Sequence, residues 1–435
     1  MKSDGATVDT VIVGGGFSGT MAAAQLVRRG VSVALVEGHG RAGVGTAYST
    51  REGVHLLNVP AAKMSAWPDR PDDFVASGHD AAAFAPRPEF GIYLRSILDA
   101  ALADGARLIA AQAVSAVRDG AAWRVALDDG GEIFARALVL AQGNQPPGRM
   151  RAGDGVDPSL FINNPWDGGT HAAIERVVAS GADVMILGTG LTMVDMVLSL
   201  DAAGHQGRII ALSRRGQVPR AHAAHDAAPV EMTEVPQGDV LRLWRWLRAR
   251  SRAVGWRGAV DALRPHAQSL WRGFSAAEQG RFLRHARPYW DVHRHRIAPQ
   301  VSEQLRAMIA AGRLEIVAGR IGAVRADGGE LTVAYARRNA SVHEERFGAV
   351  FNCTGPLGAM DRTADPLLRQ MIDEGIVAID RLGMGLAVDG ASRAAPGVWA
   401  LGPLTKGEFW EIVAVPDIRG QAATVADEIM KELRS

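Results

Sequence analysis

The sequence predicts an α/β fold with two parallel-sheet domains and a helical insert, and three observations support this prediction. The β-branched run 10–13 leads into a glycine-rich turn and then into an Ala-rich helical stretch. The apolar run 182–187 leads into a second glycine-containing turn and a second helical stretch. Such strand–turn–helix units build parallel sheets. Between Pro229 and Pro299 the pattern changes to Arg- and Trp-rich segments of helical periodicity, which predict the insert.

The composition narrows the class of partner. The chain has 435 residues, 47% of them hydrophobic, which is enough for two or three domains with buried cores. Its 48 Lys and Arg residues nearly balance 47 Asp and Glu residues, so no large net charge attracts nucleic acid or an anionic membrane. We therefore expect a small-molecule substrate, no nucleic-acid partner and no membrane partner. The sequence does not indicate an oligomeric state.

The single cysteine, Cys353, limits the redox chemistry. One cysteine cannot form an intramolecular disulfide, a two-cysteine redox motif or a Cys-rich metal site. A chain without disulfides fits a reducing compartment, although an exported protein without disulfides would look the same. No apolar run approaches the roughly 18 residues that span a bilayer, and no signal peptide is visible. We expect a cytoplasmic protein.

The first glycine-rich turn predicts a dinucleotide site. Gly14 permits the tight turn, Gly16 lets the backbone approach a pyrophosphate, and Gly19 lets helix and strand pack closely. The helix N-terminus, where Ser18 lies, offers free N–H groups to the phosphates. Glu37 ends the next strand, where a carboxylate accepts hydrogen bonds from ribose hydroxyls.

The segment after Glu37 indicates that this dinucleotide is FAD. A second glycine-rich loop covers 43–48, and the segment 56–60 follows it. A long excursion after the acidic residue is usual in flavoproteins, where it wraps the ribityl chain and the flavin ring. We expect Thr46 and Asn58 in these loops to contact FAD.

The second turn predicts an NADPH site. Gly188 and Gly190 open the next helix, with Thr192 in its first turn. The following strand leads to Arg214 and Arg215, at the place that a carboxylate holds in the first unit. A guanidinium there pairs with the 2′-phosphate of NADPH, whereas a carboxylate suits a ribose hydroxyl.

The second turn also departs from the full pattern, because Met193 stands where the third glycine is expected. The alternative is therefore two arginines on a solvated loop. The motif is degenerate compared with the first turn.

Together these patterns define an α/β fold of two dinucleotide-binding Rossmann-type domains, for FAD and NADPH, with a helical insert. Strand ends at Gly143 and Gly402 are expected to approach the flavin, and the run 349–352 is expected to return the chain to the FAD domain. The predicted parts are 1–160 for the FAD domain, 161–345 for the NADPH domain with the insert at about 229–299, and 346–435 for the returning FAD part.

The end of the chain predicts a helix over 421–433 whose N-terminus faces the flavin. Asp417 fits an N-cap role, and Pro416 keeps the approach extended. The N–H groups of that terminus would stabilise the negative charge of reduced flavin. Trp410 and Glu411 would then lie on the pocket side; the alternative is a buried turn without substrate contact.

The sequence resembles bacterial FAD/NAD(P)-binding proteins of a largely uncharacterised family, distant relatives of flavin-containing and N-hydroxylating monooxygenases. The resemblance implies a flavoprotein with two dinucleotide sites but does not fix a substrate. The flavin monooxygenase fingerprint of Phe, Gly and His is incomplete at 161–167, where the glycine and histidine are absent. The matching segments are 13–19, 57–60, 164–167, 213–216, 287–296 and 416–421.

The helical insert leaves two interpretations open. It holds five of the ten tryptophans and many arginines, which suit a lid that binds an acidic or aromatic substrate. Alternatively the tryptophans are core anchors and the arginines a solvated face. Tyr289, His293 and Trp410 are the candidate catalytic residues. We expect no metal site, because the histidines lack ligand spacing.

The function predicted from these features is an FAD-dependent oxidoreductase reduced by NADPH. A monooxygenase that activates O₂ and acts on a small organic substrate is favoured by the resemblance and by the predicted NADPH preference. The alternatives are a flavin dehydrogenase or oxidase, and a non-catalytic flavin redox sensor or partner protein.

Overall fold

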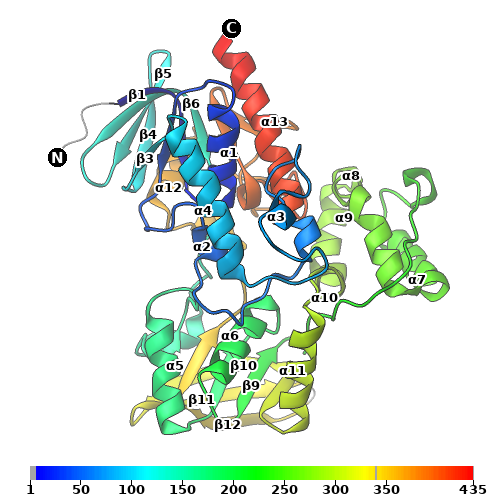
Figure 1. The fold of residues 1–435 in the computed structure, drawn as a ribbon. Helices are drawn as coiled ribbons and strands as arrows, with labels where there is room; N and C mark the ends of the chain where they lie inside the picture. The colour runs from blue at the N-terminus through cyan, green and yellow to red at the C-terminus, as the bar shows by residue number, and fades with distance from the viewer. Residues whose placement is uncertain (1–5, 339, 435) are drawn as a thin grey trace.

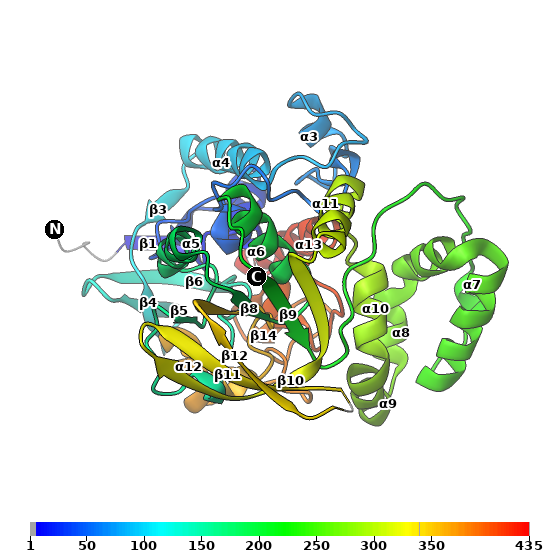
Figure 2. The same ribbon diagram turned by 90° about the horizontal axis from the view of Figure 1, so that it is seen from below.

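The computed structural model describes residues 6–338 and 340–434 and has two sheet-containing lobes with a helical arm. The first sheet lies in the upper lobe of Figure 1 and the second in the lower lobe, while the helices of residues 240–294 (α7–α10) project to one side. Figure 2 shows the arm standing clear of both sheets. The predicted mixed α/β fold with parallel sheets is confirmed.

The first sheet has the order β14-β15-β6-β1-β2-β3. Strands β15, β6, β1, β2 and β3 are parallel, and β4 and β5 extend β6 as an antiparallel hairpin. Its strands are β1 (Ala6–Val13), β2 (Val33–Val36), β3 (Arg107–Ile109), β4 (Ala113–Asp119), β5 (Ala122–Leu127), β6 (Glu132–Leu140), β14 (Arg393–Ala395) and β15 (Val398–Ala400).

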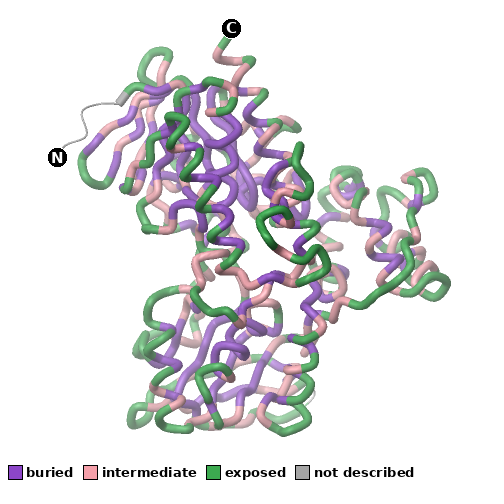
Figure 3. Tube along the Cα trace, in the orientation of Figure 1, coloured by how far each residue is buried: buried purple, intermediate pink, exposed green. Residues whose placement is uncertain are grey.

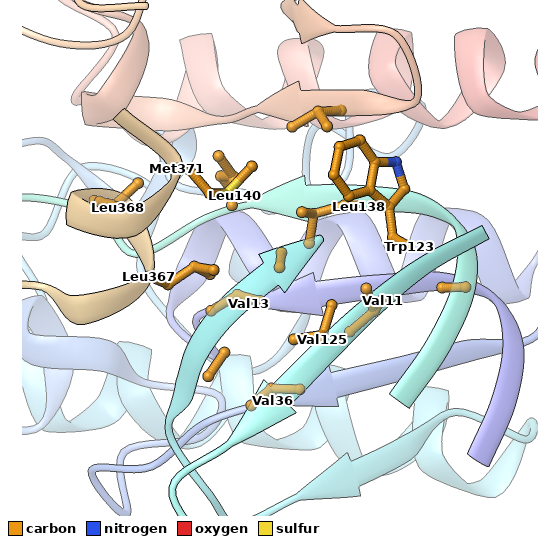
Figure 4. Packing of buried hydrophobic residues seen from close by; sticks show 14 of the residues in the cluster. Val11, Val13, Val36, Trp123, Val125, Leu138, Leu140, Leu367, Leu368 and Met371 are labelled. Carbon is orange, nitrogen blue, oxygen red and sulfur yellow. The ribbon is translucent and has the colours of Figure 1, made fainter. Parts of the chain in front are cut away.

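Both faces of the first sheet are covered. Figure 4 shows one face, where Leu138 and Leu140 pack near Leu367 and Met371 of α12 (Pro366–Asp373) and near Trp123 of the hairpin. The other face is covered by α1 (Phe17–Val27), α4 (Arg87–Ala103) and α13 (Val415–Arg434) (Figure 1). Ten of the eleven α1 residues are buried, so the helix that follows the first glycine turn is a core helix.

The second sheet has the order β12-β11-β10-β9-β8-β13-β7. Strands β7, β13, β8, β9 and the start of β10 are parallel, and β10–β12 form an antiparallel meander. Helices α5 (Gly169–Ser180), α6 (Leu191–Ala202) and α11 (Pro299–Ala310) pack on it. Its strands are β7 (Phe161–Ile162), β8 (Val184–Leu187), β9 (Ile209–Ser213), β10 (Leu314–Asp327), β11 (Glu330–Arg337), β12 (Val342–Phe347) and β13 (Ala349–Asn352).

The structure corrects the expected place of the run 349–352. This run is β13, which pairs with β7 and β8 and therefore belongs to the second sheet rather than to the returning FAD part. A short buried strand before Thr354 and Gly355 has the same local pattern in either sheet, so the sequence does not distinguish the two. The chain returns after β13, and the other proposed domain boundaries stay a prediction.

The arm consists of four α-helices, a short 3₁₀ helix and a short π-helix. Asp239 caps α7 by accepting a hydrogen bond from the Arg242 amide at 2.8 Å, and Gly255 with φ 75° kinks α7. Figure 3 shows fewer buried positions here than in the sheets. The elements are α7 (Val240–Leu263), η4 (Arg264–His266), α8 (Ala267–Gly273), α9 (Ala276–Arg281), η5 (Phe282–Ala286) and α10 (Arg287–Arg294).

The last helix begins earlier than expected. Helix α13 starts at Val415, so Asp417 lies inside its first turn and is not an N-cap. Pro416 is the second helical residue, where the missing N–H costs nothing because the first amides of a helix have no intrahelical partner. No helix in the described parts of the chain is both long enough and apolar enough to cross a membrane.

Candidate functional site

The first glycine turn forms a tight backbone cradle at the carboxyl end of β1. Gly14 has φ 102°, and a Cβ there would lie 2.5 Å from the Ala141 carbonyl oxygen. A Cβ on Gly19 would lie only 1.8 Å from the Gly14 carbonyl oxygen. Both positions therefore require glycine. The turn brings the N-terminus of α1 directly over the end of the strand.

The second turn repeats this backbone geometry. Gly188 has φ 101°, and a Cβ there would lie 2.3 Å from the Cys353 carbonyl oxygen. The residue before each helix also matches, with φ −75° and ψ −165° at Gly16 and φ −87° and ψ −162° at Gly190. The Gly14 and Gly188 amides donate to the ends of β2 and β9 at 2.9 and 2.8 Å. The two cradles are therefore equivalent in structure.

The acidic residue of the first cradle is in place beside the turn. Glu37 accepts hydrogen bonds from the Gly15 amide at 2.9 Å and the His39 amide at 2.8 Å, one on each carboxylate oxygen. Each oxygen keeps a further lone pair that can accept from a ribose hydroxyl. These contacts fix the carboxylate where the sequence predicts the ribose contact.

The loop after Glu37 docks on the first cradle. The Gly43 amide donates to the Gly15 carbonyl at 2.8 Å, and a Cβ on Gly16 would lie 3.4 Å from Gly45 Cα. Thr46 is exposed in α2 (Gly45–Tyr48), and its hydroxyl accepts from Arg41 at 3.2 Å. Arg41, which the sequence analysis missed, thus adds a cation to the loop that docks on the first cradle.

Three further FAD candidates, Gly143, Gly402 and Asn58, lie on separate segments. Gly143 and Gly402 have φ 73° and 61°, and a Cβ on Gly402 would lie 2.6 Å from Ser18 Oγ. Gln421 of α13 accepts from the Gly402 amide at 2.8 Å, which ties α13 to this strand end. The carbonyl of Asn58 accepts from His222 of the second lobe at 3.0 Å.

The structure gives the two arginines of the second cradle different surroundings. Arg214 is exposed, and no partner of its side chain is described. Arg215 donates to the Arg284 carbonyl of the helical arm at 3.2 Å. Thr189 holds the adjoining turn, because its hydroxyl forms a hydrogen bond with the Ser213 hydroxyl at 2.9 Å. The glycine pattern does not reveal this interaction. Thr192 lies in the first turn of α6, as expected, and is half-buried.

The first turn of α13 lies beside a cluster of charged groups from the arm. Glu411 is buried with φ 63°, accepts from the Trp290 indole, and pairs with Arg294 at 3.1 Å. Burial raises the pKa of Asp417, against the opposing effect of Arg264 and Arg294. These contacts connect α10 to the segment between η7 (Gly402–Thr405) and α13.

Two of the three catalytic candidates are neighbours on α10, where His293 Nδ1 lies 2.7 Å from the Tyr289 carbonyl oxygen, but the three rings have different partners. The Tyr289 ring is partly exposed and contacts Trp244, with 5.7 Å between ring centroids. His293 contacts Trp256 at 4.9 Å, and burial lowers its pKa. Trp410, which lies between η7 and α13, stacks on Trp271 of the arm. Their catalytic role stays a prediction.

Lys406 is a residue that the sequence analysis missed. It follows η7, and its ammonium donates to Asn144 Oδ1 at 2.7 Å. Burial lowers the pKa of Lys406 to about 8, which lets it exchange a proton near neutral pH. It joins the two strand ends that the sequence places near the flavin. Within 6–338 and 340–434, no group of three or more His, Cys, Asp or Glu side chains is arranged to hold a metal ion.

A buried polar network joins the two lobes next to the second cradle. Arg87 of α4 and Asp195 of α6 form a two-point ion pair, with N–O distances of 2.9 and 3.1 Å. His55 Nε2 lies 3.1 Å from the Asp195 carbonyl and 2.9 Å from Ser199 Oγ. The Thr50 hydroxyl lies 2.9 Å from His55 Nδ1. Since the network spans both lobes, it fixes their relative position.

This network predicts a loss of stability in acid. Burial lowers the pKa of His55, so the folded protein keeps the ring neutral where the unfolded chain takes up a proton. The contribution of His55 to the free energy of unfolding is fully present above its unfolded pKa of about 6.5, and it declines as the pH falls below that value. Replacing His55 with Gln should reduce the difference in unfolding free energy between about pH 7.5 and about pH 5.5, measured by urea denaturation.

Exposed His285 supplies the matched control. The His285→Gln variant should keep the pH dependence of the unmodified protein. A His55→Gln variant with that same pH dependence would contradict the assignment of the acid sensitivity to the network.

The fold and the paired cradles define a flavoprotein of the class that carries two dinucleotide-binding domains. Residues 11–145 match the family model described as FAD-NAD(P)-binding. The chain therefore contains an FAD-NAD(P)-binding domain, and the resemblance seen in the sequence is confirmed. The first cradle, Glu37 and the loop 43–48 all lie within the matched residues.

Comparisons across the whole chain agree with this class. An uncharacterised protein of Mycobacterium tuberculosis strain H37Rv is 24% identical over 409 residues, which cover 81% of this chain and 74% of that protein. The Kutzneria ornithine N-hydroxylase, solved with reduced FAD, NADP⁺ and L-ornithine, has a TM-score of 0.67 at 14% identity, covering 98% of this chain and all of that one. Thioredoxin reductase of T. acidophilum has a TM-score of 0.54 at 14% identity, covering 99% of both chains.

Proposed function

We propose that this protein is an FAD-dependent oxidoreductase that is reduced by NADPH and acts, as a monooxygenase, on a small organic substrate with O₂. The observation that carries the proposal is the pair of cradles with matching backbone geometry, one beside Glu37 and one beside Arg214. A carboxylate suits the ribose of FAD, and an arginine suits the 2′-phosphate of NADPH. A cytoplasmic location stays a prediction from the sequence.

The residues present fit both cofactors. The open amides at the starts of α1 and α6 would hold the two pyrophosphates, and Glu37 would hold the FAD ribose. When bound, FAD supplies a two-electron acceptor for the hydride of NADPH. The N-terminus of α13 would stabilise negative charge on the flavin, and Lys406 would hold or release a proton at its Nζ. The network of Arg87, Asp195 and His55 keeps the two cofactor sites in register.

The choice of a monooxygenase over a disulfide reductase rests on Cys353. It is the only cysteine, it is buried, and burial raises its pKa well above the usual range. The thiolate is the reactive form, so this thiol is unsuited to disulfide exchange. The fold shared with the ornithine N-hydroxylase named above also supports the monooxygenase. An FAD dehydrogenase or oxidase on the same fold is the second candidate.

Rapid mixing of the NADPH-reduced protein with O₂ tests the monooxygenase. We expect a transient absorbance that differs from both oxidised and reduced flavin, because a monooxygenase must retain activated oxygen before transfer. The measurement is stopped-flow absorbance. Direct return to the oxidised spectrum would favour an oxidase or dehydrogenase, and a protein that NADPH does not reduce would favour a redox sensor.

A further inference from the structure

The helical arm encloses an apolar pocket. The empty space inside it is about 540 Å³, a figure that includes space open to solvent. The lining residues come from α7, α8, η5 and α10, from Phe274 after α8 and from Trp410 of the first lobe, and all have hydrophobic side chains. The pocket therefore lies where the arm meets the segment that leads into α13.

The aromatic groups of the pocket present carbon surfaces to a ligand. Trp271 and Trp410 stack with 4.6 Å between ring centroids, and Phe282 meets Trp410 edge-on at 5.3 Å. The Trp271 indole N–H donates to the Gly407 carbonyl at 2.8 Å, and the Trp290 indole N–H donates to Glu411. Since these polar atoms already have partners, the pocket favours an aromatic ligand over a polar one.

The arm that forms the pocket is rich in arginine. Residues 239–296 contain thirteen arginines and four acidic residues, whereas the whole chain carries a net charge of only +1. Arg287 lies 5.8 Å from the centroid of the Trp410 ring, half of its side chain is exposed, and its Nε pairs with Asp291 at 3.2 Å. A negatively charged group at the pocket edge would therefore meet a favourable potential.

We propose that the helical arm is a binding site for an aromatic molecule that carries an anionic group such as a carboxylate. The rings enter the apolar pocket against Trp271, Trp290 and Trp410, and the anionic group stays at the edge near Arg287. The proposed site accounts for both the apolar lining and the arginine at the pocket edge. A packed core with a solvated basic face would not require the two to lie together. The binding does not depend on the flavin reaction.

Binding of 1-naphthoate to the FAD-loaded protein tests this site. We expect saturable quenching of tryptophan fluorescence, and weaker binding of the uncharged 1-naphthalenemethanol. Ala286 lines the pocket and is buried, so Ala286→Phe should fill it and weaken naphthoate binding about tenfold or more. Arg287→Gln, a surface change, should weaken naphthoate binding about fivefold and leave the alcohol unchanged.

Arg245 is the matched control, because it is exposed on α7 and does not line the pocket. Arg245→Gln should bind naphthoate as the unmodified protein does. The absence of saturable binding up to about 1 mM would overturn the proposal. So would Ala286→Phe and Arg287→Gln variants that bind naphthoate as tightly as the unmodified protein does. Leu241, Val254 and Tyr289 are exposed on the arm, so adsorption to anionic phosphatidylserine vesicles without naphthoate binding would instead assign the arm to a lipid surface.

Discussion

Replacing Gly19 with alanine is expected to give a protein that no longer retains FAD. The new Cβ would lie 1.8 Å from the Gly14 carbonyl oxygen, so α1 must move away from the end of β1. That movement separates the helix N-terminus from the place of the pyrophosphate and overpacks a buried helix, at a cost of about 1–3 kcal/mol. The measurement is the flavin-to-protein ratio after gel filtration, from visible absorbance, with circular dichroism to confirm folding.

Gly53 provides the control for this substitution. A Cβ at Gly53 has no neighbour within 4 Å, and the residue is exposed in a turn. Gly53→Ala should therefore keep the flavin content of the unmodified protein. A folded Gly19→Ala protein with full flavin content would show that the first cradle is not the FAD site.

Replacing Arg214 with alanine is expected to remove the preference for NADPH. A charge-assisted hydrogen bond to the 2′-phosphate is worth about 1.5–3 kcal/mol, equivalent to a roughly ten- to hundredfold rise in KM for NADPH. The KM for NADH should not change, because NADH has no phosphate at that position. Initial rates of flavin-dependent NADPH and NADH oxidation give both values.

Arg215 is the matched comparison, because its guanidinium is directed to the Arg284 carbonyl. Arg215→Ala should raise the KM for NADPH less than Arg214→Ala does. If the Arg214→Ala protein discriminates between NADPH and NADH as before, the two arginines belong to a solvated loop, and the second cradle does not select NADPH.

The cradles could be predicted from the sequence because their determinants are local. A β-branched strand, closely spaced glycines and a helix specify one backbone path, and the structure gives Gly14 and Gly188 the same left-handed conformation. The missing third glycine did not prevent the second turn from adopting this conformation, because Met193 is buried in α6 without disrupting the turn. The fold class follows from the same local patterns.

Other features depend on distant contacts and could not be read from the sequence. The run 349–352 joined the second sheet because β7 and β8 flank it, and no residue in the run itself encodes that choice. The network joins Asp195 to Arg87 and His55, which both lie more than a hundred residues earlier in the chain. The different roles of Arg214 and Arg215 likewise depend on where α10 and η5 place the Arg284 carbonyl.

Anaerobic mixing of the FAD-loaded protein with NADPH, and separately with NADH, tests the central claim most directly. The visible flavin absorbance should bleach with NADPH at least about tenfold faster than with NADH at equal concentrations, as expected for a site with an arginine at the 2′-phosphate. A flavin that bleaches equally fast with both nucleotides, or with neither, would contradict an FAD enzyme reduced by NADPH through the second cradle.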